Sequence, residues 1–90
     1  MVREIVGGQP YEYIPLGQHV VRAIRVCGGR PTFKYTRIEI SGAFDRLAAG
    51  EAMESIVAGY GNRVPREAVV EAINIVTEHF FTNLPELANT

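Results

Sequence analysis

The C-terminal half of the chain spaces its apolar residues with the period of an amphipathic helix. One stripe recurs at one-turn intervals and consists of Ala68, Val69, Ala72, Ile73, Val76 and Phe80. Pro65 suits the first position of this helix, because the donor that proline lacks would be unpaired there. Val70 and Phe81 flank one side of the stripe and Ile75 the other, so the apolar surface is wider than a small core needs. We therefore expect a long helix with an apolar face left over for a second molecule.

Two shorter helices are predicted before the long one. The first follows Ser41, a good N-cap residue, and ends at Gly50. The second runs over about residues 52–58 and ends at the glycines Gly59 and Gly61.

The N-terminal half has the patterns of short strands. Residues 19–26 are rich in valine and isoleucine, residues 11–14 predict a shorter strand, and residues 36–40 alternate strictly. Gly28 and Gly29, with Pro31 close behind, require a turn between strands. The fold class predicted is α+β, with short N-terminal strands ahead of three helices.

Ninety residues make one domain. Residues 1–10 contain a Gly-Gly-Gln-Pro run without periodicity and predict a loosely held arm. The domain itself is expected over residues 11–82, with strands at about 11–40 and helices at about 42–81. Residues 83–90 predict an irregular tail.

The composition narrows the class of protein. With 47% hydrophobic residues the chain is globular, but its apolar runs are too short to cross a bilayer, and no stretch resembles a signal peptide. We expect a soluble, cytoplasmic protein. Cys27 is the single cysteine, and nothing in the sequence brings either histidine beside it. We therefore expect no enzyme activity, no metal site and no cofactor.

Charge is divided unevenly along the chain. Residues 1–40 hold six basic and three acidic side chains, whereas residues 41–90 hold three arginines and seven carboxylates. Basic residues near the junction and at the start of the long helix are the candidates for nucleic-acid contact. These candidates are Arg30, Lys34, Arg37, Arg63 and Arg66.

Each candidate has another interpretation. Arg30 and Lys34 also fit a solvated loop, and Arg37 also fits a cross-strand partner of a carboxylate. As the last of three helices, the long helix could also enter the major groove of DNA. Its acidic solvent side, with Glu67, Glu71 and Glu78, would be repelled by phosphates, so packing and dimer contact are the alternative for this helix.

Several motifs together resemble one family. They are Cys27-Gly28-Gly29-Arg30-Pro31, Lys34, Thr36-Arg37-Ile38, Leu47-Ala48-Ala49-Gly50, Ile56, Tyr60, Glu67-Ala68-Val69 and Glu71-Ala72. Over residues 26–81 the chain resembles domain of unknown function 433, whose members are described as antitoxin-like. Two positions depart from the family pattern. Tyr35 stands where glycine is frequent, and Ala52 stands where a Ser or Thr cap is frequent, which should weaken the start of the second helix by about 1 kcal/mol.

The resemblance implies a small β portion ahead of a homeodomain-like helix-turn-helix bundle. It also implies a type II antitoxin role beside a PIN-like nuclease toxin. The first hypothesis is therefore a non-catalytic antitoxin that binds the nuclease, with contact to operator DNA through the basic junction residues as a further expectation from the charge distribution. Combined with the wide apolar helix face, the resemblance predicts a homodimer with Val70, Ile75 and Phe81 at the dimer or partner interface. The alternative is a protein-interaction or scaffold module that never binds DNA.

Overall fold

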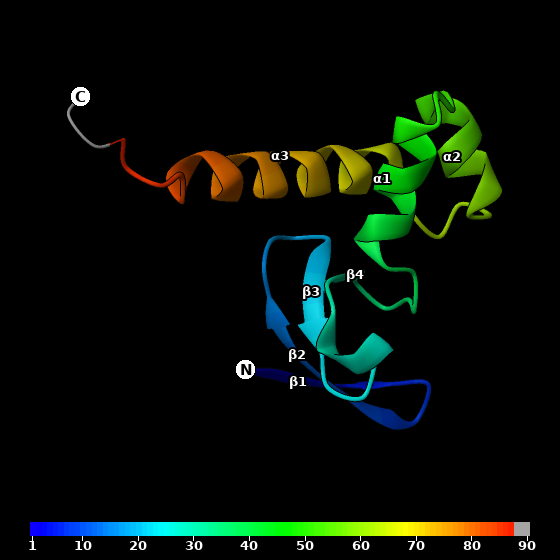
Figure 1. The fold of residues 1–90 in the computed structure, drawn as a ribbon. Helices are drawn as coiled ribbons and strands as arrows, with labels where there is room; N and C mark the ends of the chain where they lie inside the picture. Colours follow the sequence, from blue (N-terminus) through cyan, green and yellow to red (C-terminus); the bar gives the residue numbers. More distant parts are fainter. Residues whose placement is uncertain (88–90) are drawn as a thin grey trace.

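Four antiparallel strands precede three helices in the computed structural model of the chain, which describes residues 1–87. The strands form one sheet in the order β1-β2-β3-β4, and the helices cap one end of it (Figure 1). The elements are β1 (Val2–Val6), β2 (Gln9–Pro15), β3 (Val20–Ala23), a short 3-10 turn η1 (Cys27–Gly29), β4 (Thr32–Phe33), α1 (Ile40–Ala48), α2 (Met53–Gly59) and α3 (Arg66–Thr82). The predicted α+β class, with strands followed by three helices, is confirmed.

The first ten residues form a hairpin, so the prediction of a loosely held arm is wrong. β1 pairs with β2 from Val2↔Tyr13 to Val6↔Gln9. Gly7 and Gly8 connect the strands with φ values of 58° and 79°. Two consecutive residues with positive φ make the two-residue hairpin turn whose twist matches that of the strands. The Gly-Gly pair is therefore the signal of a turn and not of a loose segment.

β3 has a different neighbour on each face of the sheet. Val20 is fully buried against the helices and belongs to the main core. Val21 and Ala23 point to the opposite face and pack with Tyr13 in a second, smaller cluster. Arg22 lies on the same face as Val20 but is exposed, because the helices cover only one end of that face.

Residues 36–40 do not form the predicted strand. Tyr35 has a φ of 66°, which turns the chain, and the Thr36 hydroxyl donates to the Phe33 carbonyl and accepts from the Ile38 N–H. These local bonds replace a strand ladder. The alternation still predicted the buried side correctly, since Ile38 and Ile40 both reach the main core.

The three helices lie within about two residues of their predicted bounds. α1 begins at Ile40, so Ser41 is its second residue and not its N-cap. α2 begins after Ala52, which has no side-chain hydrogen bond to the helix. Gly50 ends the turn after α1 with a φ of 87°. Residues 83–87 are irregular, as predicted, and the rest of the predicted tail lies outside the described residues.

α3 is buried only in its first half. Ala68, Val69 and Ala72 are in the core, but Val76 is 41% exposed and Phe80 is 60% exposed. Figure 1 shows why: the helix continues past α1 and α2 and projects above the sheet. The radius of gyration is 15.1 Å, against about 12 Å for a compact chain of this length. The molecule is therefore L-shaped, with an open inner corner.

Glu71 fixes the angle of this L. Its carboxylate accepts backbone hydrogen bonds from Gln18 (3.0 Å), His19 (2.7 Å) and Val20 (3.1 Å) in the turn before β3. The prediction that Glu71 faces solvent is wrong. Gly17 makes this approach possible, because a Cβ there would overlap the Glu71 carboxylate and lie 2.9 Å from Ile75 Cδ1.

Candidate interaction surfaces

Arg30 is engaged within the chain. Its guanidinium bonds to Glu39 at 2.6 Å, and this contact lowers the pKa of the Glu39 carboxyl. The pair is exposed, so it restrains Arg30 without removing it from solvent. The Glu39 contact therefore favours the interpretation of Arg30 as part of a solvated loop over that of a side chain free to bind phosphate.

Lys34 is held in a cluster of aromatic residues. Its Nζ lies 5.0 Å from the ring centres of both Tyr13 and Tyr35 and 3.9 Å from the Glu4 carboxylate. The pKa of Lys34 is raised, chiefly by Tyr13. Hydroxyl donation from Tyr13, and then from Tyr35, holds the pKa of Glu4 below its usual range. This cluster ties β1 and β2 to the loop after β4 and leaves Lys34 half-buried.

Arg37 and Arg63 come together although they are far apart in the sequence. Both line a depression of about 390 Å³ beside Tyr11 and Tyr35, and no carboxylate lines it. Among residues 1–87, neither arginine has an ion pair, so the predicted cross-strand carboxylate partner of Arg37 is not found. These two arginines form a small basic patch, which we call the Arg37–Arg63 patch.

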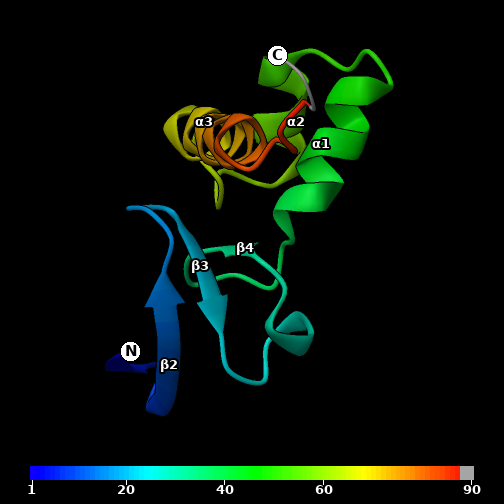
Figure 2. The same cartoon turned by 60° about the vertical axis from the view of Figure 1, so that its left-hand side comes forward.

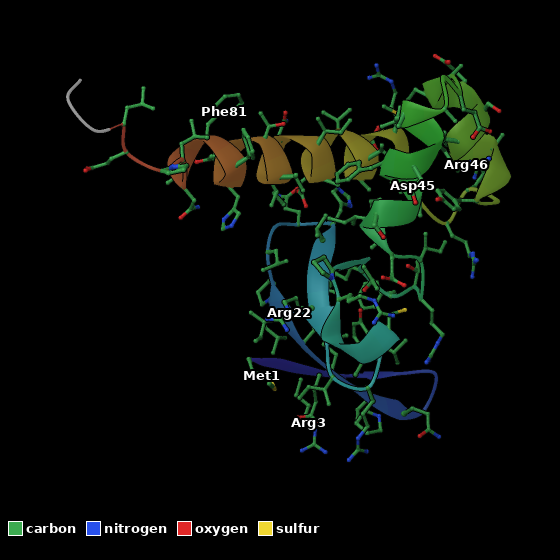
Figure 3. The ribbon with its side chains drawn as sticks, viewed as in Figure 1. Met1, Arg3, Arg22, Asp45, Arg46 and Phe81 are labelled. Carbon is green, nitrogen blue, oxygen red and sulfur yellow. The ribbon has the colours of Figure 1, made fainter. Side chains whose placement is uncertain are left out.

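Arg66 lies on an acidic surface. A depression of about 430 Å³ follows one side of α3 and is lined by Arg66, Glu67, Val70, Glu71, Asn74, Ile75 and Glu78. We call it the acidic face of α3. Val70 and Ile75 are half-buried in it. Phe81 is 65% exposed and lies farther along α3, on the side away from the sheet (Figure 3).

The inner corner of the L is an apolar groove of about 580 Å³. Its lining comes from α3, the start of α1, β3 with the turn before it, and η1 with the loop after it. The lining residues are Leu16, Val20, Arg22, Gly28, Gly29, Arg30, Pro31, Ile40, Ile75, Val76 and His79. Figure 2, which looks closer to the axis of α3, shows the helix lying above the start of β3. A smaller depression continues the groove down the sheet past Ile14 and Ile24.

The residues considered for catalysis are dispersed. The Cys27 thiol donates to the Arg37 carbonyl at 3.3 Å, while His79 lines the groove and His19 lies in the turn bonded to Glu71. No group of three or more His, Cys, Asp or Glu residues within 1–87 is placed to hold a metal ion. No helix in this range is long and apolar enough to cross a membrane.

Sequence reasoning missed the groove and the function of Glu71. The sequence patterns predict Ile14 and Ile24 as parts of short strands, and no local pattern shows that helices cover only one end of the sheet. Glu71 follows the same helical spacing as the exposed carboxylates beside it. A glycine at position 17 was the one local sign of a close contact, but it does not identify the partner.

A family model described as "Protein of unknown function (DUF433)" matches residues 20–74, more than half of the chain. The matched range runs from β3 into α3 and omits the β1–β2 hairpin and the projecting end of α3. Neither the curated proteins nor the solved structures contain a match to the chain.

Proposed function

The chain belongs to the DUF433 family of proteins of unknown function, and we propose that it is a non-catalytic, antitoxin-like module of the cytoplasm. In this proposal the chain acts as a homodimer and binds a PIN-like nuclease toxin. The resemblance of the central motifs to antitoxin-like proteins supports the choice of partner.

One observation carries the proposal, namely that the described structure leaves α3 uncovered beyond its first half. The acidic face has Val70 and Ile75 half-buried among the carboxylates of Glu67 and Glu78, and Phe81 continues it toward the end of the helix. Apolar side chains within an acidic rim suit contact with a basic protein surface, since electrostatic complementarity favours such a partner and speeds association. A nuclease that binds RNA has such a surface.

The test is inhibition of a PIN-like nuclease encoded beside the gene for this chain. RNA cleavage is measured with increasing amounts of the purified chain. We expect stoichiometric inhibition by the wild-type chain, and loss of inhibition by the double variant Glu67→Lys/Glu78→Lys.

The matched control is Glu54→Lys, which reverses an exposed carboxylate on α2, outside the acidic face. We expect it to inhibit like the wild type. Unchanged cleavage in an excess of the wild-type chain would refute the nuclease-binding function. Equal inhibition by the control and the double variant would show that the nuclease binds a surface other than the acidic face of α3.

A second candidate function, contact with operator DNA, is favoured by the Arg37–Arg63 patch. Two arginines without an ion pair among residues 1–87, beside the exposed ring of Tyr35 and the half-buried ring of Tyr11, suit phosphate binding with stacking. In a dimer the patch occurs twice and offers about four phosphate contacts. Four contacts predict a loss of affinity of roughly 100-fold between 50 and 200 mM salt.

The DNA test is retention of the chain's own upstream region at these two salt concentrations. We expect Arg37→Ala/Arg63→Ala to abolish retention, and Arg30→Ala to change it little because Arg30 is bonded to Glu39. Absence of retention at either concentration would leave the protein-interaction module without DNA binding. Equal losses in both variants would show that the patch has no special role.

A further inference from the structure

The apolar groove in the inner corner of the L is open in the chain as described. Val76 and His79 line it from above, Leu16 and Val20 from the end of the sheet, and Pro31 from the loop after η1. Val76 and Leu16 are 41% and 39% exposed, so their apolar atoms remain accessible. Ile14 and Ile24, 45% and 46% exposed, continue the groove down the same sheet face.

The same chain also carries an exposed helical projection, the C-terminal end of α3. From Val76 to Thr82, α3 extends for about 9 Å at 1.5 Å per residue beyond its buried part. Phe80 is 60% exposed on this part, and its ring packs edge-on against Phe81 with the ring centres 5.2 Å apart. Phe80 is not among the residues that line the groove of its own chain, and α3 runs straight to its end (Figure 1).

We propose that the groove receives the C-terminal end of α3 from a second copy of this chain, with Phe80 as the inserted side chain. The proposal rests on the homodimer of the proposed function and specifies how that dimer forms. A two-fold axis repeats the contact, so that both grooves are filled and both helix ends are covered at once.

Charge complementarity favours this occupant. Arg22 and Arg30 stand at the groove, and the Arg22 guanidinium donates to the Gly29 carbonyl without an ion pair to any carboxylate within residues 1–87. The C-terminus of a helix carries a partial negative charge. In this chain Glu86, which is exposed, follows α3 closely. A second copy therefore brings negative charge to a basic rim, while Glu39, the partner of Arg30, offsets part of that rim.

Cysteine crosslinking tests the proposal. Two variants in a Cys27→Ser background, Leu16→Cys and Phe80→Cys, are mixed in equal amounts and mildly oxidised. We expect the mixed disulfide, identified by mass spectrometry at twice the 9.9 kDa chain mass, to form at least fivefold more than with Glu78→Cys in place of Phe80→Cys. Glu78 is two residues from Phe80 and about 160° around the helix, so it points away from the groove.

A second measurement uses light scattering to obtain the dimer dissociation constant. Phe80→Asp should raise it at least tenfold, whereas Asn74→Asp, which adds the same charge on the acidic face, should leave it within about twofold. A wild-type chain that is monomeric at about 100 μM would overturn both this contact and the homodimer of the proposed function. A stable dimer without excess mixed disulfide, or one indifferent to Phe80→Asp, would overturn the groove contact alone.

Discussion

Removing the Glu71 carboxylate should destabilise this fold more than removing any exposed carboxylate of α3. The perturbation is Glu71→Ala. It removes three acceptor contacts, of which those from His19 and Val20 go to Oε1 in a partly buried site and that from Gln18 goes to Oε2 at the surface. Val20 is fully buried, so its N–H would be left without an acceptor.

The expected loss is about 3 kcal/mol of unfolding free energy. Hydrogen bonds to a charged acceptor contribute roughly 1.5–3 kcal/mol each when buried, and less when solvent screens them. Counting the Val20 bond in full and the other two at a reduced value gives this total. Glu71→Gln should lose only about 1 kcal/mol, because Oε1 can still accept from His19 and Val20 while the amide group faces the Gln18 N–H.

The assay is urea denaturation followed by far-UV circular dichroism, which gives the free energy from the linear dependence on denaturant. Glu78→Ala is the matched control, since it removes an exposed carboxylate from the same helix and should change stability by no more than about 0.5 kcal/mol. If Glu71→Ala and Glu78→Ala are equally stable, the hydrogen bonds from the turn before β3 to Glu71 do not stabilise the fold.

Gly17→Ala provides a second test of the same contact. The added Cβ would overlap the Glu71 carboxylate, and such overlaps cost about 1–3 kcal/mol. In the Glu71→Ala background only the close approach to Ile75 Cδ1 remains, so the cost should be smaller. Additive effects of the two substitutions would contradict a direct contact.

Three further predictions concern single positions. Ala52→Ser should stabilise the chain by about 1 kcal/mol in the same assay, since Ala52 caps α2 without a side-chain bond, whereas Ala58→Ser should not. At Tyr35, with a φ of 66°, the Gly variant should be more stable than the Ala variant by about 1 kcal/mol, and the reverse order would contradict the left-handed backbone. The bonds from Arg46 lower the pKa of Glu51 below its usual value, so this carboxylate stabilises the fold above its unfolded pKa and loses that effect as pH falls through the lower folded pKa. The stability of Glu51→Gln should therefore fall less than that of wild type between pH 7 and pH 3, and parallel profiles would exclude the linkage.

The sequence predicted what depends on local periodicity. The stripe of α3 identified Ala68, Val69 and Ala72 as core residues because a helical repeat indicates which side is apolar. The same repeat included Val76 and Phe80, which are exposed. Periodicity shows which side of a helix would be buried, but not whether another element lies opposite it.

Contacts between distant segments could not be predicted in this way. The sequence indicates unpaired cations at Arg30 and Lys34, because their carboxylate partners become neighbours only after folding. Conversely, Arg37 and Arg63 share a depression through the packing of the loop after β4 beside the start of α3, which no spacing rule encodes. The Gly7–Gly8 hairpin was different, since its turn signal was local and was misread.

The three surfaces lie on one scaffold and have different linings, except that Ile75 lines both the acidic face and the groove. The Arg37–Arg63 patch lies near the start of α3, the acidic face follows its side, and the groove lies under its projecting end. The Glu71 contact fixes the angle between α3 and the sheet, and the groove has one wall from each. A change in that angle must therefore alter the groove, while the Arg37–Arg63 patch, built without Glu71 or Gly17, should be affected less. We expect Gly17→Ala to weaken dimerisation more than it weakens DNA retention, and an equal loss of both would indicate general unfolding instead of a shifted helix.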